Sequence, residues 1–280
     1  MNLPDSAKLS AGAIAAMREV ADKLILPRFQ KLAKGDVRTK THPGDLVTVA
    51  DVESEQALTK SLPALLPGSL VIGEEAASAD AGVLDHLKQD EAVWIIDPID
   101  GTANFVEGIP RFAVMVALVR KGQTIMGWIH DPIAGRTLWA EVGAGAWLEG
   151  ESGRHIRVHA PPPPTQALSS MTAGLYAREF AHLKGRFARI IRLGSAAHDY
   201  WSLTDGRMHV LNFKRLKPWD HAAGLLIHKE AGGFNRMLSG AEYAPAEPNQ
   251  VGVLCAPTET AWREIVALHQ SEHQSGHPSG

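Results

Sequence analysis

Two aspartates stand three residues apart where an apolar run ends. The run lies in WIIDPIDGTAN, residues 94–104, in which Asp97 and Asp100 are followed by Gly101 and Thr102. One interpretation is a simple turn, because aspartate, proline and glycine all favour turns. The other is a cation site, since carboxylates are costly to bring together unless a cation sits among them. The remaining acidic residues decide between the two interpretations.

Further acids stand at the ends of other apolar segments. Glu74 and Glu75 follow LVIG, and Asp220 lies in WDHAAG at the predicted start of a helix. Several oxygen ligands at such positions favour Mg²⁺, with Mn²⁺ as an alternative. Zinc fits less well, because the 13 histidines form no HExxH motif and no clustered pair near these acids.

The residues after the second aspartate add a phosphate site. If a helix begins at Gly101 and Thr102, its first backbone N–H groups favour a phosphate. Glycine also lets the phosphate approach without a side chain in the way. Metal ligands, free amides and a hydroxyl together indicate phosphoryl chemistry.

The motifs GEE, DPIDGT and WDHAAG together resemble those of the inositol monophosphatase family, the lithium-sensitive, Mg²⁺-dependent sugar and polyol phosphatases. The resemblance runs from the first predicted helix to about residue 268, with the motifs in the family's order and spacing. It implies a phosphomonoesterase that carries two or three Mg²⁺ per site and acts on a small phosphorylated sugar or polyol. It also implies a homodimer. Haloacid-dehalogenase phosphatases fit less well, because their paired aspartates are two apart and near the N-terminus.

The resemblance also implies a set of metal ligands. Glu74, Asp97 and the backbone carbonyl of Ile99 would hold a first ion. Asp97 would bridge to a second ion, which Asp100 and Asp220 complete. A carboxylate shared between two ions suits the roughly 3.5 to 4 Å spacing of two-metal sites.

The same resemblance names the catalytic residues and a mobile loop. The Thr102 hydroxyl, paired with Asp51, would orient the attacking water, so Asp51, Glu74 and Thr102 are the expected catalytic residues. Lys40 and Asp45 would belong to a mobile loop that helps to hold a further, weaker metal ion. No phosphorylated enzyme is required.

Substrate contacts are expected around the phosphate and the sugar ring. The segment GSAA at 194–197 matches the family's segment that contacts ring hydroxyls. The full expected set is Asp100, Gly101, Thr102, Gly194, Ser195, Ala196, Phe213, Arg215 and Asp220.

One position departs from the family pattern. Inositol phosphatases usually carry a glutamate where this chain has Phe213, and the basic residues Lys214, Arg215 and Lys217 follow. Those three residues form either a solvated edge or a rim that binds a second anionic group. Three alternatives therefore stay open: fructose-1,6-bisphosphatase activity, histidinol-phosphatase activity, and a transcription antitermination partner with weak phosphatase activity.

The expected fold is α+β, a layered α-β-α-β-α sandwich. A long amphipathic helix is predicted over 6–33 and a second over 51–66, with strands at 70–75 and 92–97. Three further antiparallel segments follow between 111 and 150. We expect an N-terminal α+β domain over 1–150 and a C-terminal α/β domain over 151–270. The prolines at 161–164 form a stiff connector, and residues 271–280 form a disordered tail.

Composition narrows the class of partner. A net charge of −3 and a pI near 6.5 make nucleic acid an unlikely partner. The longest apolar run, FAVMVALV from Phe112, is too short to span a bilayer, so no membrane partner is expected. The single cysteine, Cys255, has no partner for an intrachain disulfide, which fits a reducing compartment. We expect a cytoplasmic protein.

Overall fold

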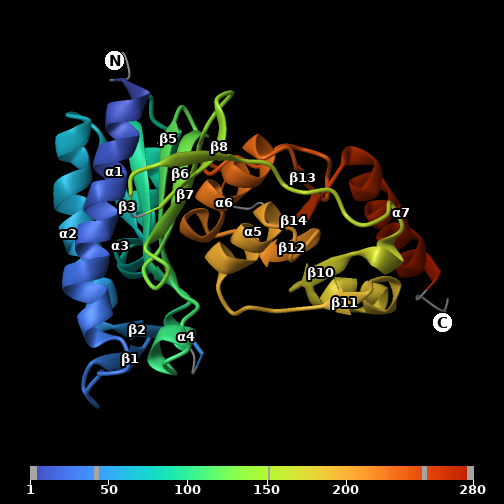
Figure 1. The fold of residues 1–280 in the computed structure, drawn as a ribbon, viewed down its shortest axis with the longest axis horizontal. Coiled ribbons are helices and arrows are strands. Elements are labelled where there is room, and N and C mark those ends of the chain that lie inside the picture. Colours follow the sequence, from blue (N-terminus) through green and yellow to red (C-terminus); the bar gives the residue numbers. More distant parts are fainter. Residues whose placement is uncertain (1–4, 41–43, 151, 248–250, 276–280) are drawn as a thin grey trace.

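Five layers of helices and sheets stack along the long axis of the molecule, in the order α-β-α-β-α (Figure 1). The structure is a computed structural model, and it describes residues 5–40, 44–150, 152–247 and 251–275. The predicted sandwich is therefore confirmed. Among the helices so described, none combines the length and apolar character that crossing a bilayer demands.

The first layer consists of α1 (Ser6–Val20) and α2 (Val49–Leu65). After α1 the helix continues as a π-helical turn, Ala21–Ile25, and a tight 3₁₀ turn, Leu26–Arg28. The predicted extension to residue 33 is therefore wrong. Pro27 tightens this last turn, because its ring fixes the backbone and removes a donor from the helical ladder. A hairpin of β1 (Val37–Thr39) and β2 (Leu46–Thr48) connects the two helices.

The second layer is a seven-stranded sheet in which each strand neighbours the next in sequence. β3 and β4 are parallel, and all later neighbours are antiparallel. The strands are β3 (Leu70–Gly73), β4 (Ala92–Asp100), β5 (Ala113–Arg120), β6 (Gln123–Asp131), β7 (Arg136–Glu141), β8 (Gly145–Glu149) and β9 (His155–Val158). The predicted segment over 135–150 thus forms two strands.

Two strand ends differ from the prediction in a way that matters for the site. Glu74 and Glu75 do not end β3 but open the short helix α3 (Glu74–Ala79), which a 3₁₀ helix, Ala81–Lys88, follows. β4 continues through both aspartates, with a register shift between Asp97 and Asp100. A helix does begin at the predicted place, as α4 (Thr102–Val106).

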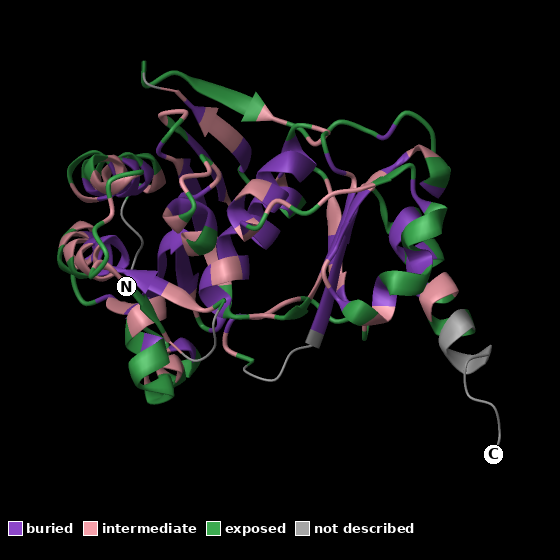
Figure 2. Ribbon diagram, turned by 90° about the horizontal axis from the view of Figure 1, so that it is seen from below, coloured by how far each residue is buried: buried purple, intermediate pink, exposed green. Residues whose placement is uncertain are grey.

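The middle layer consists of α5 (Ala196–Thr204) and α6 (Pro218–Glu230), which lie between the two sheets (Figures 1 and 2). α6 is buried along nearly its whole length. The second sheet has the order β11-β10-β12-β14-β13. Its strands are β10 (Thr172–Leu175), β11 (Arg189–Ile190), β12 (Val210–Arg215), β13 (Phe234–Met237) and β14 (Val251–Ala256).

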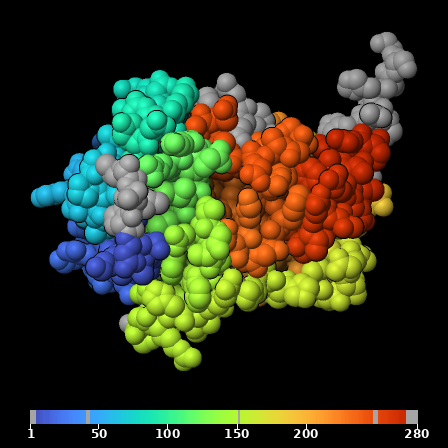
Figure 3. Space-filling view, turned by 90° about the horizontal axis from the view of Figure 1, so that it is seen from above, coloured from blue at the N-terminus to red at the C-terminus, as the bar shows by residue number. Residues whose placement is uncertain are grey.

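The outer layer is α7 (Glu259–Ser275) with the 3₁₀ helices Leu168–Ser170 and Arg178–Arg186. The disordered tail predicted from residue 271 therefore starts too early, and residues 276–280 lie outside the described residues. In the chain segment that connects the first sheet to the second, the proline run at 161–164 follows β9. Figure 3 shows the yellow-green segment after residue 150 crossing the surface toward the orange and red half.

Candidate active site

Three carboxylates from distant parts of the chain meet beside the end of β4. One oxygen from each of Glu74, Asp97 and Asp220 lies within 4.8 Å of the others. Glu74 opens α3, Asp97 lies in β4 and Asp220 lies in the first turn of α6. They line a cavity of about 220 Å³. Its other lining residues are Gly44, Asp45, Leu46, Ile99, Asp100, Gly101, Thr102, Ala103 and Gly194.

The electrostatics of this cluster are unfavourable without a cation. Burial raises the pKa of Asp97 well above its usual range, and the charges of Glu74, Asp100 and Asp220 raise it further. Burial likewise raises the pKa of Asp220, again with a contribution from Glu74. The folded protein therefore holds acids in a place where their ionised forms repel one another.

Lys40 supplies one positive charge at the edge of the cluster. Its Nζ donates to Glu74 Oε1 at 2.9 Å and to Glu75 Oε1 at 2.6 Å. Burial by itself lowers the pKa of Lys40, but the charge of Glu74 and both hydrogen bonds raise it above its usual value. Its backbone N donates to Asp45 O at 2.7 Å, so both predicted loop residues lie beside the cavity. The predicted mobility of this loop stays a prediction, and residues 41–43 of it lie outside the described residues.

Asp51 lies at the start of α2 and links that helix to Thr102. The Asp51 Oδ2 atom accepts from the Thr48 backbone N at 2.8 Å and from the Thr48 hydroxyl at 2.5 Å. Its Oδ1 accepts from the Thr102 hydroxyl at 3.1 Å, which also contacts Ile99 O at 3.0 Å. Burial raises the pKa of Asp51 to about 6. The capping box that starts α2 thus also fixes the predicted Asp51–Thr102 pair.

Gly101 adopts a backbone conformation that favours glycine. It caps α4 with φ of 88°. A Cβ at this position would meet Arg111 O at 2.9 Å and Ser195 Cβ at 3.1 Å. The strand end, α4 and the start of α5 therefore approach one another closely only because this residue has no side chain.

Asp100 lines the same cavity but is held from α5. Its carboxylate accepts from the Ser195 hydroxyl, from Ala196 N at 3.1 Å and from Ala197 N at 2.9 Å. Ser195 and Ala196, predicted to contact substrate, thus contact Asp100, whereas Gly194 lines the cavity. The Asn104 amide fixes this segment from α4 by donating to Gly194 O at 3.2 Å.

Glu55 is a residue that the sequence analysis missed. It lies in α2, and its carboxylate accepts from Glu75 N at 2.8 Å and Ala76 N at 2.9 Å. A Cβ on Gly73 would overlap this carboxylate, since Glu55 Cδ would be 2.0 Å away. Glu55 therefore caps α3 from another helix and fixes the start that carries Glu74. A capping contact across 20 residues leaves no local signal in the sequence.

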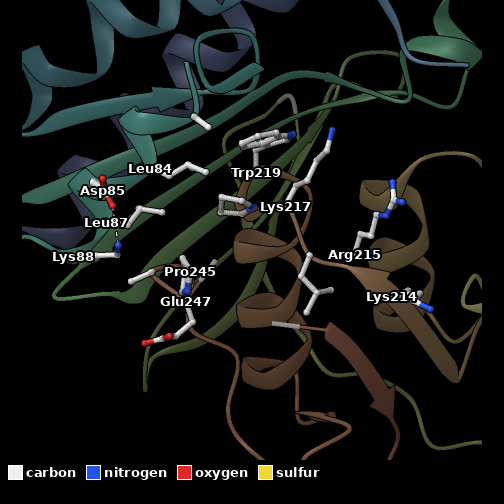
Figure 4. Close-up of a pocket in the computed structure, with 14 residues that line it drawn as sticks. Leu84, Asp85, Leu87, Lys88, Lys214, Arg215, Lys217, Trp219, Pro245 and Glu247 are labelled. Atoms are coloured by element: carbon white, nitrogen blue, oxygen red, sulfur yellow. Dashed lines mark hydrogen bonds and ion pairs between the residues drawn. The ribbon is translucent and has the colours of Figure 1, made fainter. Parts of the chain in front are cut away.

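Phe213 and the basic residues lie beside this cavity rather than in its lining. The Phe213 ring stacks on Tyr176 at a centroid distance of 4.8 Å. Arg215 and Lys217 line a neighbouring pocket of about 620 Å³, whose apolar lining includes Leu84 and Leu87 (Figure 4).

The three basic side chains differ in their surroundings. Lys214 pairs with Glu179 at 3.2 Å. The Lys217 Nζ lies 5.4 Å from the ring centroid of Trp219, the residue before Asp220. Figure 4 shows Lys217 and Arg215 extending to the same side of the segment that leads into α6. Residues that line the neighbouring pocket, such as Trp219, therefore directly precede Asp220 of the carboxylate cluster.

The donor set fits a hard divalent cation. The atoms that face the cavity are carboxylate oxygens of Glu74, Asp97 and Asp220, which are typical Mg²⁺ or Mn²⁺ ligands. The raised pKa values of Asp97 and Asp220 show that their negative charge is poorly compensated in the protein alone. A bound cation would remove that cost.

Comparison with known families gives a match over nearly the whole chain. A family model described as the inositol monophosphatase family matches residues 5–275. A Thermotoga maritima protein named fructose-1,6-bisphosphatase/inositol-1-monophosphatase is 36% identical over 211 residues, which cover 74% of this chain and 77% of that protein. An inositol-1-monophosphatase of Rhizobium meliloti is 32% identical over 237 residues, 80% of this chain and 84% of that protein.

Solved structures give the same result for the fold. The Thermotoga maritima IMPase superposes with a TM-score of 0.76 at 30% identity, covering 94% of this chain and 97% of that chain. Mycobacterium tuberculosis SuhB superposes with a TM-score of 0.72 at 27% identity, covering 94% and 96%. The layered sandwich therefore extends over nearly the full length of both chains.

Proposed function

Since this chain belongs to the inositol monophosphatase family, it is a phosphatase of sugar or polyol phosphates, and we propose that it works with Mg²⁺ held by Glu74, Asp97 and Asp220. The observation that carries the proposal is the approach of these three carboxylates to within 4.8 Å in one cavity. Asp100 and the carbonyl of Ile99 line the same cavity and complete the proposed ligand set. Mg²⁺ bound there supplies Lewis-acid chemistry, since it neutralises phosphate charge and acidifies water.

The chain's own groups position the attacking water. The Thr102 hydroxyl directs its proton to Asp51 or to the Ile99 carbonyl, so its lone pairs remain available to accept from a water molecule. Asp51 is itself fixed by two hydrogen bonds from Thr48. A fixed acceptor holds the water in one orientation toward phosphorus, which is the entropic part of catalysis.

Substrate orientation is proposed to come from the glycines of the cavity and from the neighbouring basic pocket. Gly101 and Gly194 line the cavity and present backbone rather than side chains to it. Arg215 and Lys217 in the neighbouring pocket are proposed to hold a second anionic group where a substrate carries one. Phe213, whose ring stacks on Tyr176, offers no acceptor for ring hydroxyls.

A phosphate-release assay tests the proposal directly. The protein, freed of metal with a chelator, is expected to release no phosphate from inositol 1-phosphate or from sugar monophosphates until Mg²⁺ is restored. We also expect Li⁺ to inhibit phosphate release. The test uses Li⁺ at roughly tens of millimolar, so that the effect exceeds that of ordinary ionic screening. Metal-independent turnover would contradict the proposed role of the carboxylates. A homodimeric state and a cytoplasmic location also stay predictions.

A further inference from the structure

Asp100 is oriented by a chain of side chains that ends at β6, a strand of the same sheet as β4. The Ser195 hydroxyl donates to Asp100 Oδ2. The same Ser195 oxygen lies 3.0 Å from Nδ1 of His198, one turn further along the helix, and accepts from His198 N at 3.2 Å. His198 is half-buried, whereas Ser195 and Asp100 are buried.

The other ring nitrogen of His198 faces Asp131, the last residue of β6. Nε2 lies 3.6 Å from Asp131 Oδ2. Asp131 is itself fixed, because its Oδ1 accepts from Ile133 N and Ala134 N, both at 2.9 Å. The pKa of Asp131 lies below its usual value: burial raises it, and the interaction with His198 together with the backbone hydrogen bonds from Ala134 and Ile133 outweighs burial. Asp131, His198, Ser195 and Asp100 thus form a continuous row from β6 to the candidate metal site.

Counting protons fixes the direction of the row. Serine has one proton, and in this geometry it goes to Asp100. The Ser195 oxygen must then accept from His198, so Nδ1 carries a proton. Nε2, the other ring nitrogen, lies 3.6 Å from the Asp131 carboxylate. The Ser195 hydroxyl therefore has a donor in Nδ1 of His198 and an acceptor in Asp100.

We propose that His198 is a positioning residue, which holds the Ser195 hydroxyl so that its proton goes to Asp100 and thereby fixes the Asp100 carboxylate at the metal site. The inference rests on the proposed function, because it concerns a ligand of the proposed Mg²⁺ site. Outer-shell partners of this kind typically change metal affinity by 10- to 100-fold.

A nucleophilic role for the same three side-chain types does not fit. A Ser-His-Asp nucleophile needs an exposed hydroxyl whose proton the histidine takes. Ser195 is 4% exposed and gives its proton to Asp100. His198 therefore acts on the orientation of a metal ligand and not on bond formation.

The first experiment compares His198→Ala with His198→Asn. Asparagine can still donate one hydrogen bond to Ser195, whereas alanine cannot. The Mg²⁺ concentration for half-maximal phosphate release, and the dissociation constant for Mg²⁺ measured by calorimetry, are expected to be about 10-fold higher in His198→Ala. His198→Asn is expected to restore most of the affinity. Ser202→Ala is the matched control, because it removes the bond from Ser202 to His198 O at 2.7 Å within the same helix and leaves the row intact.

The second experiment asks whether His198 acts through Ser195. In a Ser195→Ala background, His198→Ala is expected to change Mg²⁺ affinity by less than about 2-fold, because residues in one row are not additive. If His198→Ala does not fold, Asp131→Asn removes the charge from the other end of the row. Asp131→Asn keeps an oxygen for Ile133 N and Ala134 N, and it is expected to weaken Mg²⁺ binding.

The outcomes separate the two proposals. Wild-type Mg²⁺ affinity in both His198→Ala and Asp131→Asn would overturn the role of His198 and leave the phosphatase proposal intact. An equal loss from His198→Ala with and without the Ser195 hydroxyl would also overturn it. Absence of any Mg²⁺ binding by the wild-type protein would instead contradict the proposed function.

Discussion

Asp97 is a carboxylate whose pKa depends on the other acids of the site. Glu74, Asp100, Asp220 and Asp51 all raise its pKa in addition to burial. We predict that Asp97→Asn lowers kcat by more than about 100-fold, since even outer-shell changes cost 10- to 100-fold in metal sites. The same change removes a buried charge, so the melting temperature of the chelated variant is expected to exceed that of the chelated wild type. Near-wild-type turnover with restored Mg²⁺ would make the ligand assignment wrong.

The pKa values of the acids predict how Mg²⁺ stabilises the protein at different pH. Burial raises the pKa of Asp51 to about 6 and of Glu75 to about 7. Both exceed the unfolded values near 4. Between about pH 4 and 7 the native state therefore binds more protons than the unfolded chain, and these groups make the metal-free protein less stable as pH rises through this window.

A bound cation offsets that loss only where the acids are ionised. We predict that saturating Mg²⁺ raises the melting temperature more at pH 8 than at pH 5.5. The measurement is thermal unfolding with Mg²⁺ and with chelator at each pH. The difference between the two melting temperatures at one pH removes the effect of groups that titrate elsewhere. One such group is His228, because burial lowers its pKa to about 4. Equal shifts at the two pH values would show that Mg²⁺ binding is not linked to the ionisation of the buried acids of the site.

At the scale of residues, acids at the ends of apolar segments predicted a cation site, and the family resemblance named the carboxylates that meet. Glu74, Asp97 and Asp220 come from three motifs, and each motif is short enough to read locally. The contacts that orient them could not be read in this way. Ser195 reaches Asp100 across 95 residues, and no single motif contains both side chains. Phe213 was identified as a departure, but its stacking on Tyr176 depends on the pairing of β10 with β12.

At the scale of elements, the cap of α3 controls where Glu74 stands. Glu55 binds two amides at the start of this short helix. We predict that Glu55→Ala destabilises the protein by about 1 kcal/mol, the usual cost of losing a helix cap. It is also expected to weaken Mg²⁺ binding, because Glu74 adjoins the freed amide of Glu75.

A matched control lies on the same helix. Glu53 pairs with Arg28 at 2.6 Å near the surface, and Glu53→Ala leaves the α3 amides capped. Thermal unfolding and Mg²⁺ titration of both variants check the prediction. Similar Mg²⁺ affinities in the two variants would show that the cap does not position Glu74.

Strand and helix types followed from periodicity, whereas their ends followed from contacts that are not local. The glutamates after LVIG open a helix because Glu55 caps their amides. β4 carries both aspartates because β5 pairs with it on both sides of the register shift. α7 passes the predicted end at 270, since polar residues do not by themselves stop a helix.

At the scale of the whole molecule, the neighbouring basic pocket bears on the choice of substrate. Arg215 and Lys217 line it beside the helix that carries Asp220. Charge-assisted hydrogen bonds to a second anionic group are worth roughly 1.5 to 3 kcal/mol each. We predict that Arg215→Ala lowers kcat/KM for fructose 1,6-bisphosphate about 10-fold or more and leaves that for inositol 1-phosphate nearly unchanged.

Lys214→Ala is the matched control for this substitution, because Lys214 lines the same pocket but its ammonium group already pairs with Glu179. Steady-state kinetics with both substrates give the ratio of kcat/KM values. A ratio that Arg215→Ala leaves unchanged would mean that the basic residues are only a solvated edge.

The burial of α6 between the sheets has a consequence for how the chain can be divided. One apolar cluster combines Val93 and Met115 of the first sheet with Ala223 and Ile227 of α6 and Val253 of the second sheet. A fragment of residues 5–158 would keep its seven strands but leave the face that α6 covers exposed to water. Exposed apolar surface of that extent promotes aggregation. We therefore expect this fragment to aggregate or to bind a hydrophobic dye strongly when expressed alone, and a monomeric fragment that binds no dye would show that the first sheet does not need α6.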